Sequence, residues 1–205
     1  MKLVVGLGNP GRRYARSRHN VGFRVVSRFA AEHGIALEQE DFRGIFGRGT
    51  LDCGQGTTLE VGVLRPLTYM NLSGDAVAEA VATLPIDDPS RDLLVVTDDV
   101  DLPFGRLRLR PGGGAGGQRG LAHIIECLGL REFPRLRFGI GRPPGRTETS
   151  EYVLEGFSRQ EEASLEARVA RAAEAVTAAL CAGVAAAMNE FNREPEESDR
   201  TASEP

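Results

Sequence analysis

The sequence predicts an α/β fold: a single-domain layered sandwich with a mixed, mostly parallel central sheet flanked by helices. Short β-branched runs alternate along the chain with segments whose apolar residues recur every three or four positions, as strands interleaved with helices do. The 205 residues are enough for one sizeable core, and the composition, 41% hydrophobic and 26% charged, is that of an ordinary globular protein.

In the first half of the chain, residues 2–7, 59–64 and 93–96 are short apolar runs, and each predicts a strand. The run 93–96 is wholly apolar and therefore central in the sheet. Residues 21–33 carry an apolar stripe at helical spacing that is closed by Gly34. Ser73 is placed to cap a second helix that extends to about Leu84.

In the second half, residues 106–110 alternate Arg and Leu, which predicts a half-exposed strand with three guanidinium groups on one face. Residues 112–117 are too rich in glycine for regular structure and predict a loop, after which 121–128 predict a helix and 136–140 a strand. Residues 158–161 form a capping-box pattern that opens a long alanine-rich helix to about Phe191, with a break at Gly183.

The composition of the C-terminal segment, the length of the apolar runs and the cysteine spacing predict the extent of the domain and the cell compartment. Residues 192–205 are acidic and lack large apolar groups, so we expect one domain over 1–191 and a disordered tail. No apolar run approaches a membrane span and the N-terminus lacks a signal-peptide pattern, so we expect a cytoplasmic protein. Cys53, Cys127 and Cys181 are far apart, which predicts neutral or buried thiols and neither a disulfide nor a zinc framework.

The charges are segregated along the chain. The net charge is −4, and residues 190–205 account for all of it, so residues 1–189 are neutral overall. Arginines gather in two segments, 12–28 and 106–146, the second containing only two acidic residues, Glu126 and Glu132. This distribution fits contacts with nucleic-acid phosphates, and it also fits ordinary solvated arginines in a chain whose only lysine is Lys2.

Two glycine motifs suggest nucleotide sites but lack the required context. The spacing Gly6-x-Gly8-x-x-Gly11 matches the dinucleotide fingerprint, yet no helical stripe opens at the glycines, which argues against a nicotinamide site. The glycines of 112–117 lack the Gly-Lys-Ser/Thr ending of a P-loop, which argues against an NTPase. A flexible backbone after an arginine-rich strand suits a phosphate contact or a mobile lid.

His19 is the natural candidate for acid–base chemistry. It follows the first predicted strand in the run Arg-His-Asn, and Asp98 and Asp99 follow the strand 93–96. Because α/β folds place their sites at strand ends, these carboxylates are candidates to orient the imidazole. His33 and His123 lie within helical patterns without neighbouring carboxylates, and we expect them to make structural hydrogen bonds.

Several segments together resemble bacterial peptidyl-tRNA hydrolase. They are GLGNPG, YARSRHNVGF, RPLTYMNLSG, VVTDDVDLP, GGGAGG and RLRFGIGRP, in the order and approximate spacing of that family over residues 1–190. The resemblance implies a monomeric, cofactor-free and metal-free hydrolase with no obligate protein partner. Such an enzyme cleaves the ester between a peptide and the 3′-terminal ribose of tRNA.

The resemblance also implies roles for individual residues. His19 corresponds to the general base, Asp98 to the carboxylate that holds it, and Asn9 to the carboxamide that helps distinguish a peptidyl from an aminoacyl group. Substrate-contacting positions correspond to Tyr14, Tyr69, Met70 and Asn71, and phosphate-gripping positions to Arg110 and Arg137. These residue types suit the reaction, since carboxamides can stabilise an oxyanion and arginines can read RNA phosphates.

One segment departs from the family. His-Asn-Gly usually follows the glycine loop, but here the residues are Gln118-Arg119-Gly120. Arg119 donates hydrogen bonds and never accepts them, so a water-positioning role is in doubt and a phosphate contact becomes plausible. Two alternatives to the hydrolase stay open. One is an RNA-binding protein that has lost hydrolysis, which Gln118-Arg119 favours, and the other is a nucleotide-dependent oxidoreductase, which rests on the Gly6–Gly11 fingerprint alone.

Overall fold

The computed structural model describes residues 1–193 and contains a seven-stranded sheet in the order β2-β3-β4-β1-β5-β7-β6. Its strands are β1 (Lys2–Gly6), β2 (Gln39–Asp41), β3 (Gly44–Asp52), β4 (Thr58–Pro66), β5 (Leu93–Asp99), β6 (Leu107–Arg110) and β7 (Arg135–Gly139). Its α-helices are α1 (Val21–Glu32), α2 (Ser73–Thr83), α3 (Pro89–Asp92), α4 (Arg119–Leu128), α5 (Thr149–Tyr152), α6 (Arg159–Cys181) and α7 (Val184–Phe191), and short 3₁₀ turns form η1 (Arg18–Asn20) and η2 (Met70–Leu72).

The sheet is mixed and mostly parallel, as predicted. β1 pairs in parallel with both β4 and β5, and β5 pairs in parallel with β7. β3 runs antiparallel to β2 and β4, and β6 runs antiparallel to β7. Only β3 and β6 therefore run against the common direction. The strand β1 lies at the centre of the sheet, with β2 to β4 on one side and β5 to β7 on the other.

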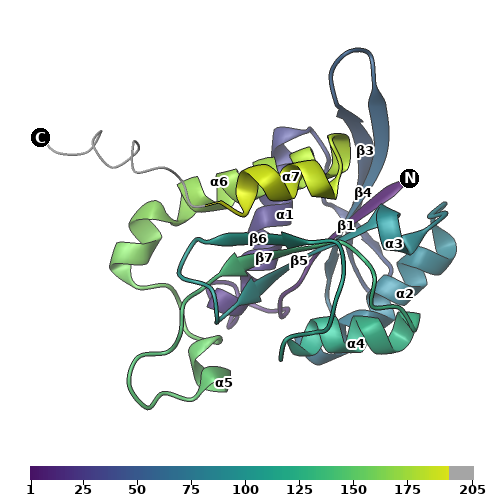
Figure 1. The fold of residues 1–205 in the computed structure, drawn as a ribbon. Coiled ribbons are helices and arrows are strands. Elements are labelled where there is room, and N and C mark those ends of the chain that lie inside the picture. Colours follow the sequence, from purple (N-terminus) through teal and green to yellow (C-terminus); the bar gives the residue numbers. More distant parts are fainter. Residues whose placement is uncertain (194–205) are drawn as a thin grey trace, which may run out of the picture.

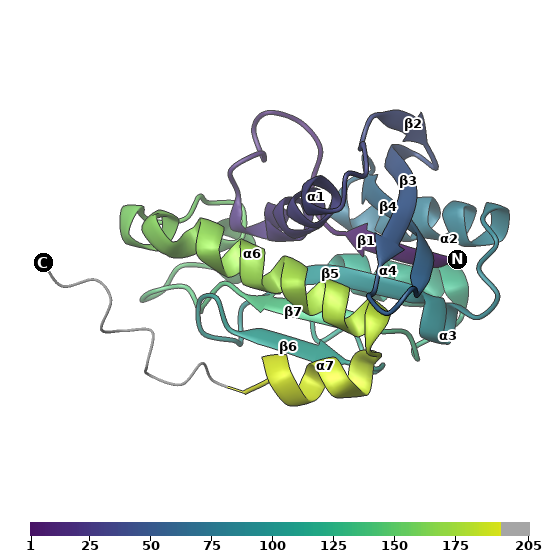
Figure 2. The ribbon, with the colours of Figure 1, turned by 90° about the horizontal axis from the view of Figure 1, so that it is seen from above.

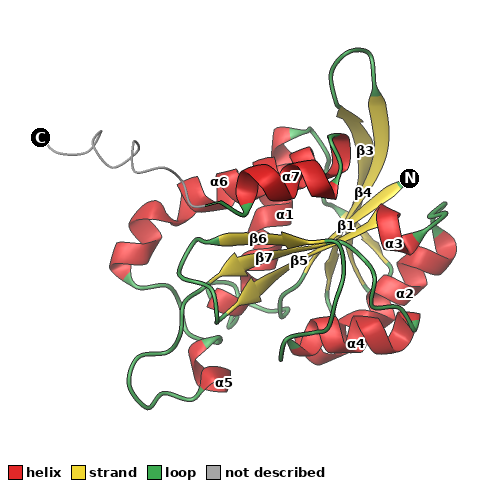
Figure 3. Ribbon diagram, viewed as in Figure 1, coloured by secondary structure: helices red, strands yellow, loops and turns green. Residues whose placement is uncertain are grey.

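Helices cover both faces of the sheet and bury two apolar clusters. Figure 1 shows α1, α6 and α7 on one face and α2 and α4 on the other, and Figure 3 shows the same view by type of element. In Figure 2, seen from above, α6 lies beside α1, and α7 lies beside the edge strand β6. Val96 and Phe138 belong to the cluster under α1 and α6, and Leu7 and Ile124 belong to the cluster under α2 and α4.

Most of the predicted elements are confirmed, with shifted ends. The capping box is complete, since Ser158 accepts from the Glu161 amide and the Glu161 side chain accepts from the Ser158 amide. Gly183, with φ of 87°, separates α6 from α7. The predicted cap at Ser73 is wrong: Leu72 holds the N-cap position, and the Ser73 hydroxyl donates to the Met70 carbonyl.

The prediction of three unpaired thiols is also wrong, because Cys53 and Cys181 form a disulfide. The sequence did not predict strands β2 and β3, and β3 with β4 forms the hairpin that carries Cys53 to the end of α6. The two residues are 128 positions apart, so nothing local in the sequence signals the bond. Cys127 is the free cysteine.

The glycine fingerprint has the geometry of a helix packing site. Residues 12–16 form turns, and α1 begins only at Val21, so no α-helix N-terminus lies at the glycines. A Cβ on Gly6 would lie 2.4 Å from the Gly22 carbonyl oxygen, which explains why glycine is needed where β1 meets α1.

At the C-terminal end, contacts with the sheet extend one residue beyond the predicted domain boundary at residue 191. The Asn192 side chain accepts from the Leu109 amide at 2.7 Å and donates to the Leu109 carbonyl, which pairs it with the edge strand β6. Most of the predicted disordered tail, residues 194–205, lies outside the described residues. No helix within 1–193 is long and apolar enough to span a membrane.

Candidate active site

A cavity of about 490 Å³ lies at the carboxyl ends of β1, β4 and β5, the edge where open α/β sheets bind ligands. Its walls come from the loop after β1, from η2, from the glycine-rich loop and the start of α4, and from α5. Nine of the ten predicted site residues line it: Asn9, Tyr14, His19, Tyr69, Met70, Asn71, Asp98, Arg119 and Arg137. Arg110, the tenth, is exposed on β6 outside the cavity.

His19 and Asp98 form the closest polar pair in this cavity. His19 Nδ1 lies 2.7 Å from Asp98 Oδ2, and the side chains are 14% and 3% exposed. Because an ionised carboxylate only accepts hydrogen bonds, Nδ1 carries the proton, and in the neutral ring Nε2 therefore has the lone pair. No residue within 1–193 bonds to Nε2, so the ring can act as a base there.

The other oxygen of Asp98 is also occupied. Gln118 Nε2 donates to Oδ1 at 3.2 Å, and the Thr97 hydroxyl donates to the same atom at 3.3 Å. Gln118 is itself fixed, because its Oε1 accepts from the Leu121 amide and caps α4. One carboxamide thus connects the start of α4 to the carboxylate that holds the imidazole.

Asn9 is positioned by a second carboxamide, Asn20. Asn20 accepts from the Asn9 amide at 2.7 Å and donates to the Asn9 carbonyl at 2.9 Å. The Asn9 Oδ1 in turn accepts from the Met70 amide at 2.8 Å, which ties the β1 loop to η2. Its Nδ2 has no partner among the described residues, so Asn9 presents a hydrogen-bond donor to the cavity.

The segment that carries His19 is held by the chain after α5. The amides of Arg18 and His19 donate to the carbonyls of Glu155 and Val153. The Arg18 guanidinium forms a two-bonded pair with Glu161 at 2.8 Å and stacks on Tyr152 and Phe157. Arg18 is therefore a buried structural residue. The exposed members of the first arginine cluster are Arg12, Arg13, Arg16 and Arg28, of which Arg28 pairs with Glu32.

Two members of the second arginine cluster, Arg119 at the start of α4 and Arg137 on β7, line the cavity. Arg137 pairs with Asp99 at 3.2 Å, and the β6–β7 register places Arg108 opposite Arg137 and Arg110 opposite Arg135. Arg135 is buried, and its guanidinium donates to the carbonyls of Gly113 and Gly114 in the glycine-rich loop. Burial lowers the pKa of Arg135 below its ordinary value, and the side chain serves to hold that loop in place.

Sequence reasoning left some site residues without a role. Gln118 was identified only as a departure and Asn20 only as a neighbour of His19, yet both hold the reacting groups. Thr149, Ser150, Val153 and Leu154 also line the cavity, and no pattern in their segment predicts it. Both histidines expected to be structural make such hydrogen bonds: His33 with the Thr177 hydroxyl, and His123 Nδ1 with the Gly74 amide. Unlike the sequence expectation, His123 also has a carboxylate nearby, that of Asp75.

Comparison with known proteins shows the family to which this sequence and fold are similar. The family model described as Peptidyl-tRNA hydrolase matches residues 3–199. The peptidyl-tRNA hydrolase of Chloroflexus aggregans is 48% identical over 94% of this chain and 99% of its own, and that of Carboxydothermus hydrogenoformans is 47% identical with the same coverage. The crystal structure of peptidyl-tRNA hydrolase from Acinetobacter baumannii is 37% identical over 94% of both chains, with a TM-score of 0.84. The chain belongs to the peptidyl-tRNA hydrolase family.

Proposed function

We propose that His19, oriented by Asp98, is the general base with which this chain hydrolyses peptidyl-tRNA to free tRNA and peptide. The observation that carries this proposal is the 2.7 Å pair between His19 Nδ1 and Asp98 Oδ2 on the wall of the cavity. The ester to be cleaved joins the peptide to the 3′-terminal ribose.

In this mechanism the Nε2 lone pair of His19 takes a proton from a water molecule as its oxygen attacks the ester carbonyl. The imidazolium that forms is stabilised by Asp98, which remains ionised. The tetrahedral intermediate then collapses, the bond to the ribose oxygen breaks, and the imidazolium returns the proton to that oxygen. His19 ends each cycle neutral.

Asn9 supplies a donor where negative charge develops. Its Oδ1 is already bonded to the Met70 amide, so only the NH₂ group faces the substrate. A neutral amide donates to a carbonyl oxygen or oxyanion without competing for the proton that His19 handles. Tyr69, 57% exposed at the cavity mouth, and Asn71 are placed to contact the peptide.

The RNA portion is proposed to lie along the arginines of β6, β7 and α4. Arg108, Arg110 and Arg137 share a face of the β6–β7 pair, and Arg119 opens α4 at the cavity. Guanidinium groups bind phosphates in two-bonded geometry, which gives affinity without base specificity. By the family resemblance, we further propose a monomer that acts in the cytoplasm without an obligate protein partner, with residues 1–191 as the catalytic domain.

The test is release of the acyl group from an N-blocked aminoacyl-tRNA by the wild type and by His19→Ala. We expect the variant to lose about 10²–10⁴-fold in kcat, the usual contribution of a general base, and to bind tRNA with unchanged affinity. Turnover absent from the wild type would favour the binding-only alternative. Equal turnover by both proteins would rule out His19 as the base.

A further inference from the structure

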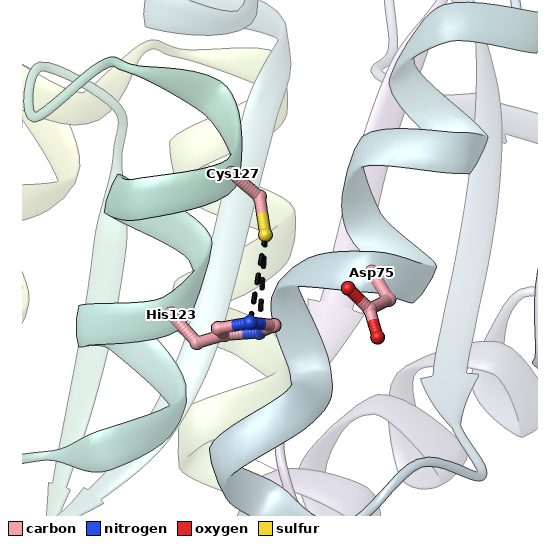
Figure 4. Close-up of side chains that lie close together, drawn as sticks. All are labelled: Asp75, His123 and Cys127. Carbon is pink, nitrogen blue, oxygen red and sulfur yellow. Dashed lines mark hydrogen bonds between the residues drawn. The ribbon is translucent and has the colours of Figure 1, made fainter.

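Outside the active site, three potential metal ligands meet between α2 and α4. His123 and Cys127 are one helical turn apart on α4, and Asp75 extends from α2 (Figure 4). One ligand atom from each residue lies within 4.8 Å of the other two. Nothing in the hydrolytic mechanism uses these side chains.

We propose that Asp75, His123 and Cys127 bind a divalent transition-metal ion of the zinc class. A tetrahedral Zn²⁺ with Zn–N of about 2.1 Å and Zn–S of about 2.3 Å separates its nitrogen and sulfur ligands by about 3.6 Å. Cys127 Sγ lies 3.7 Å from His123 Nε2 and 3.9 Å from Nδ1, so the sulfur is already near both ring nitrogens, although the ring must turn before one of them faces a shared metal. A thiolate, an imidazole and a carboxylate are ligands that Zn²⁺ accepts together, and solvent can fill the fourth position because Cys127 is exposed.

Close packing of the two helices creates this arrangement. A Cβ on Gly74 would lie 2.4 Å from the His123 carbonyl oxygen, so only glycine allows α2 and α4 to approach this closely. The neighbouring Asp75 is thereby brought to the imidazole. Asp75 also pairs with the exposed Arg43, which has a second partner in Glu79, so Asp75 can turn towards a metal without leaving Arg43 unpaired.

Metal binding requires a local rearrangement. The Gly74 amide donates to His123 Nδ1 at 3.0 Å, so the neutral ring keeps its proton on Nε2. The ring must release this amide and turn about its Cβ–Cγ bond, which lets one nitrogen bind the metal while the other stays protonated. Loss of one neutral hydrogen bond reduces the affinity by roughly fivefold, a small part of the affinity of a three-ligand site.

The charge around the sulfur favours a cation. Two carboxylates, those of Asp75 and Glu126, are close enough to interact electrostatically with the Cys127 sulfur. A bound dication displaces the thiol proton, because a coordinating thiol is deprotonated.

The test is titration of the oxidised full-length protein with Co²⁺, followed by the near-ultraviolet thiolate-to-Co²⁺ charge-transfer band. Cys53 and Cys181 are joined, so the band can come only from Cys127. We expect a band that saturates at one Co²⁺ per chain, disappears on addition of Zn²⁺, and is absent in Cys127→Ser. Asp75→Asn should weaken Co²⁺ binding at least about tenfold, since even partners outside the ligand shell contribute 10–100-fold.

Controls separate a built site from a lone thiol. His33→Gln and Glu60→Gln remove an imidazole and a carboxylate outside the cluster, Glu60 being paired with Arg48 on the β3–β4 hairpin. Both should retain the band with affinity within about threefold of the wild type. Absence of the band at millimolar Co²⁺ would overturn the proposal. So would a band whose affinity is unchanged in Asp75→Asn and in His123→Gln, with circular dichroism confirming that each variant is folded.

Discussion

Replacing Asp98 with asparagine should abolish most of the activity without altering the fold, for a reason visible in its contacts. Oδ1 of Asp98 faces two donors, the Gln118 amide and the Thr97 hydroxyl. The asparagine must therefore place its oxygen there and its NH₂ group towards His19. That NH₂ donates to Nδ1, so the ring proton moves to Nε2 and removes the lone pair that should accept the proton of water.

The expected loss follows from this change of tautomer. General-base catalysis contributes about 10²–10⁴-fold, or about 2.7–5.5 kcal/mol at 1.36 kcal/mol per tenfold. We expect kcat for an N-blocked aminoacyl-tRNA to fall by that factor under single-turnover conditions, with tRNA affinity unchanged. Thermal unfolding should confirm that the variant is folded.

Asp101→Asn is the matched control. Asp101 lies two residues beyond the end of β5, is exposed, and pairs with the exposed Arg142. Because it makes no contact with His19, the same change of carboxylate to amide should leave kcat within about twofold. If the folded Asp98→Asn variant retained more than a tenth of the wild-type kcat, the proposal that Asp98 sets the tautomer of His19 would be refuted.

Three further results are expected. The double variant Cys53→Ser, Cys181→Ser removes the disulfide that closes a 128-residue loop, and this closure stabilises the fold by up to ~5 kcal/mol through the entropy of the unfolded chain. Tm measured by calorimetry should therefore fall by up to ~10–20 °C, and an unchanged Tm would argue against the bond. Burial alone would raise the pKa of Glu161, but hydrogen bonds from Arg18 and Ser158 lower it. The stability that these bonds provide is present above the pKa of Glu161 in the unfolded chain and is lost as the pH falls through its pKa in the folded protein, so Tm measured from pH 7 to pH 3 should decline less steeply for Glu161→Gln than for the wild type. Parallel curves for the two proteins would contradict the pairing. Arg137→Ala should raise KM for the tRNA substrate and reduce the dependence of KM on salt concentration by about one phosphate contact, whereas Arg142→Ala should change neither. A change confined to kcat would exclude the phosphate role of Arg137.

The sequence predicted the fold class because its signals are local. The apolar run of β5, the helical stripe of α1 and the complete capping box of α6 each specify their element within a few residues. Asn9, His19, Tyr69 and Asp98 came together because they lie at or after the ends of β1, β4 and β5, which meet at one edge of the sheet, whereas Arg110 lies on β6 outside the cavity.

What the sequence did not predict depends on contacts between distant segments. The β3 strand, GIFGRGTLD, contains three glycines and lacks clear alternation, so neither the hairpin nor the Cys53–Cys181 bond could be predicted. Gln118 reaches Asp98 only because the N-terminus of α4, which Gln118 caps, lies next to the end of β5. The neighbours of His123 come from α2, packed closely at Gly74, and no spacing within α4 indicates them.

The protonation state of His19 tests the central claim most directly. In ¹⁵N spectra of the imidazoles at neutral pH, with three histidines in the chain, His19 can be assigned by its absence from His19→Gln. We predict a neutral ring protonated at Nδ1 and unprotonated at Nε2, and the opposite tautomer in Asp98→Asn. A wild-type ring that is protonated at Nε2 at a pH where the enzyme is fully active would contradict the mechanism.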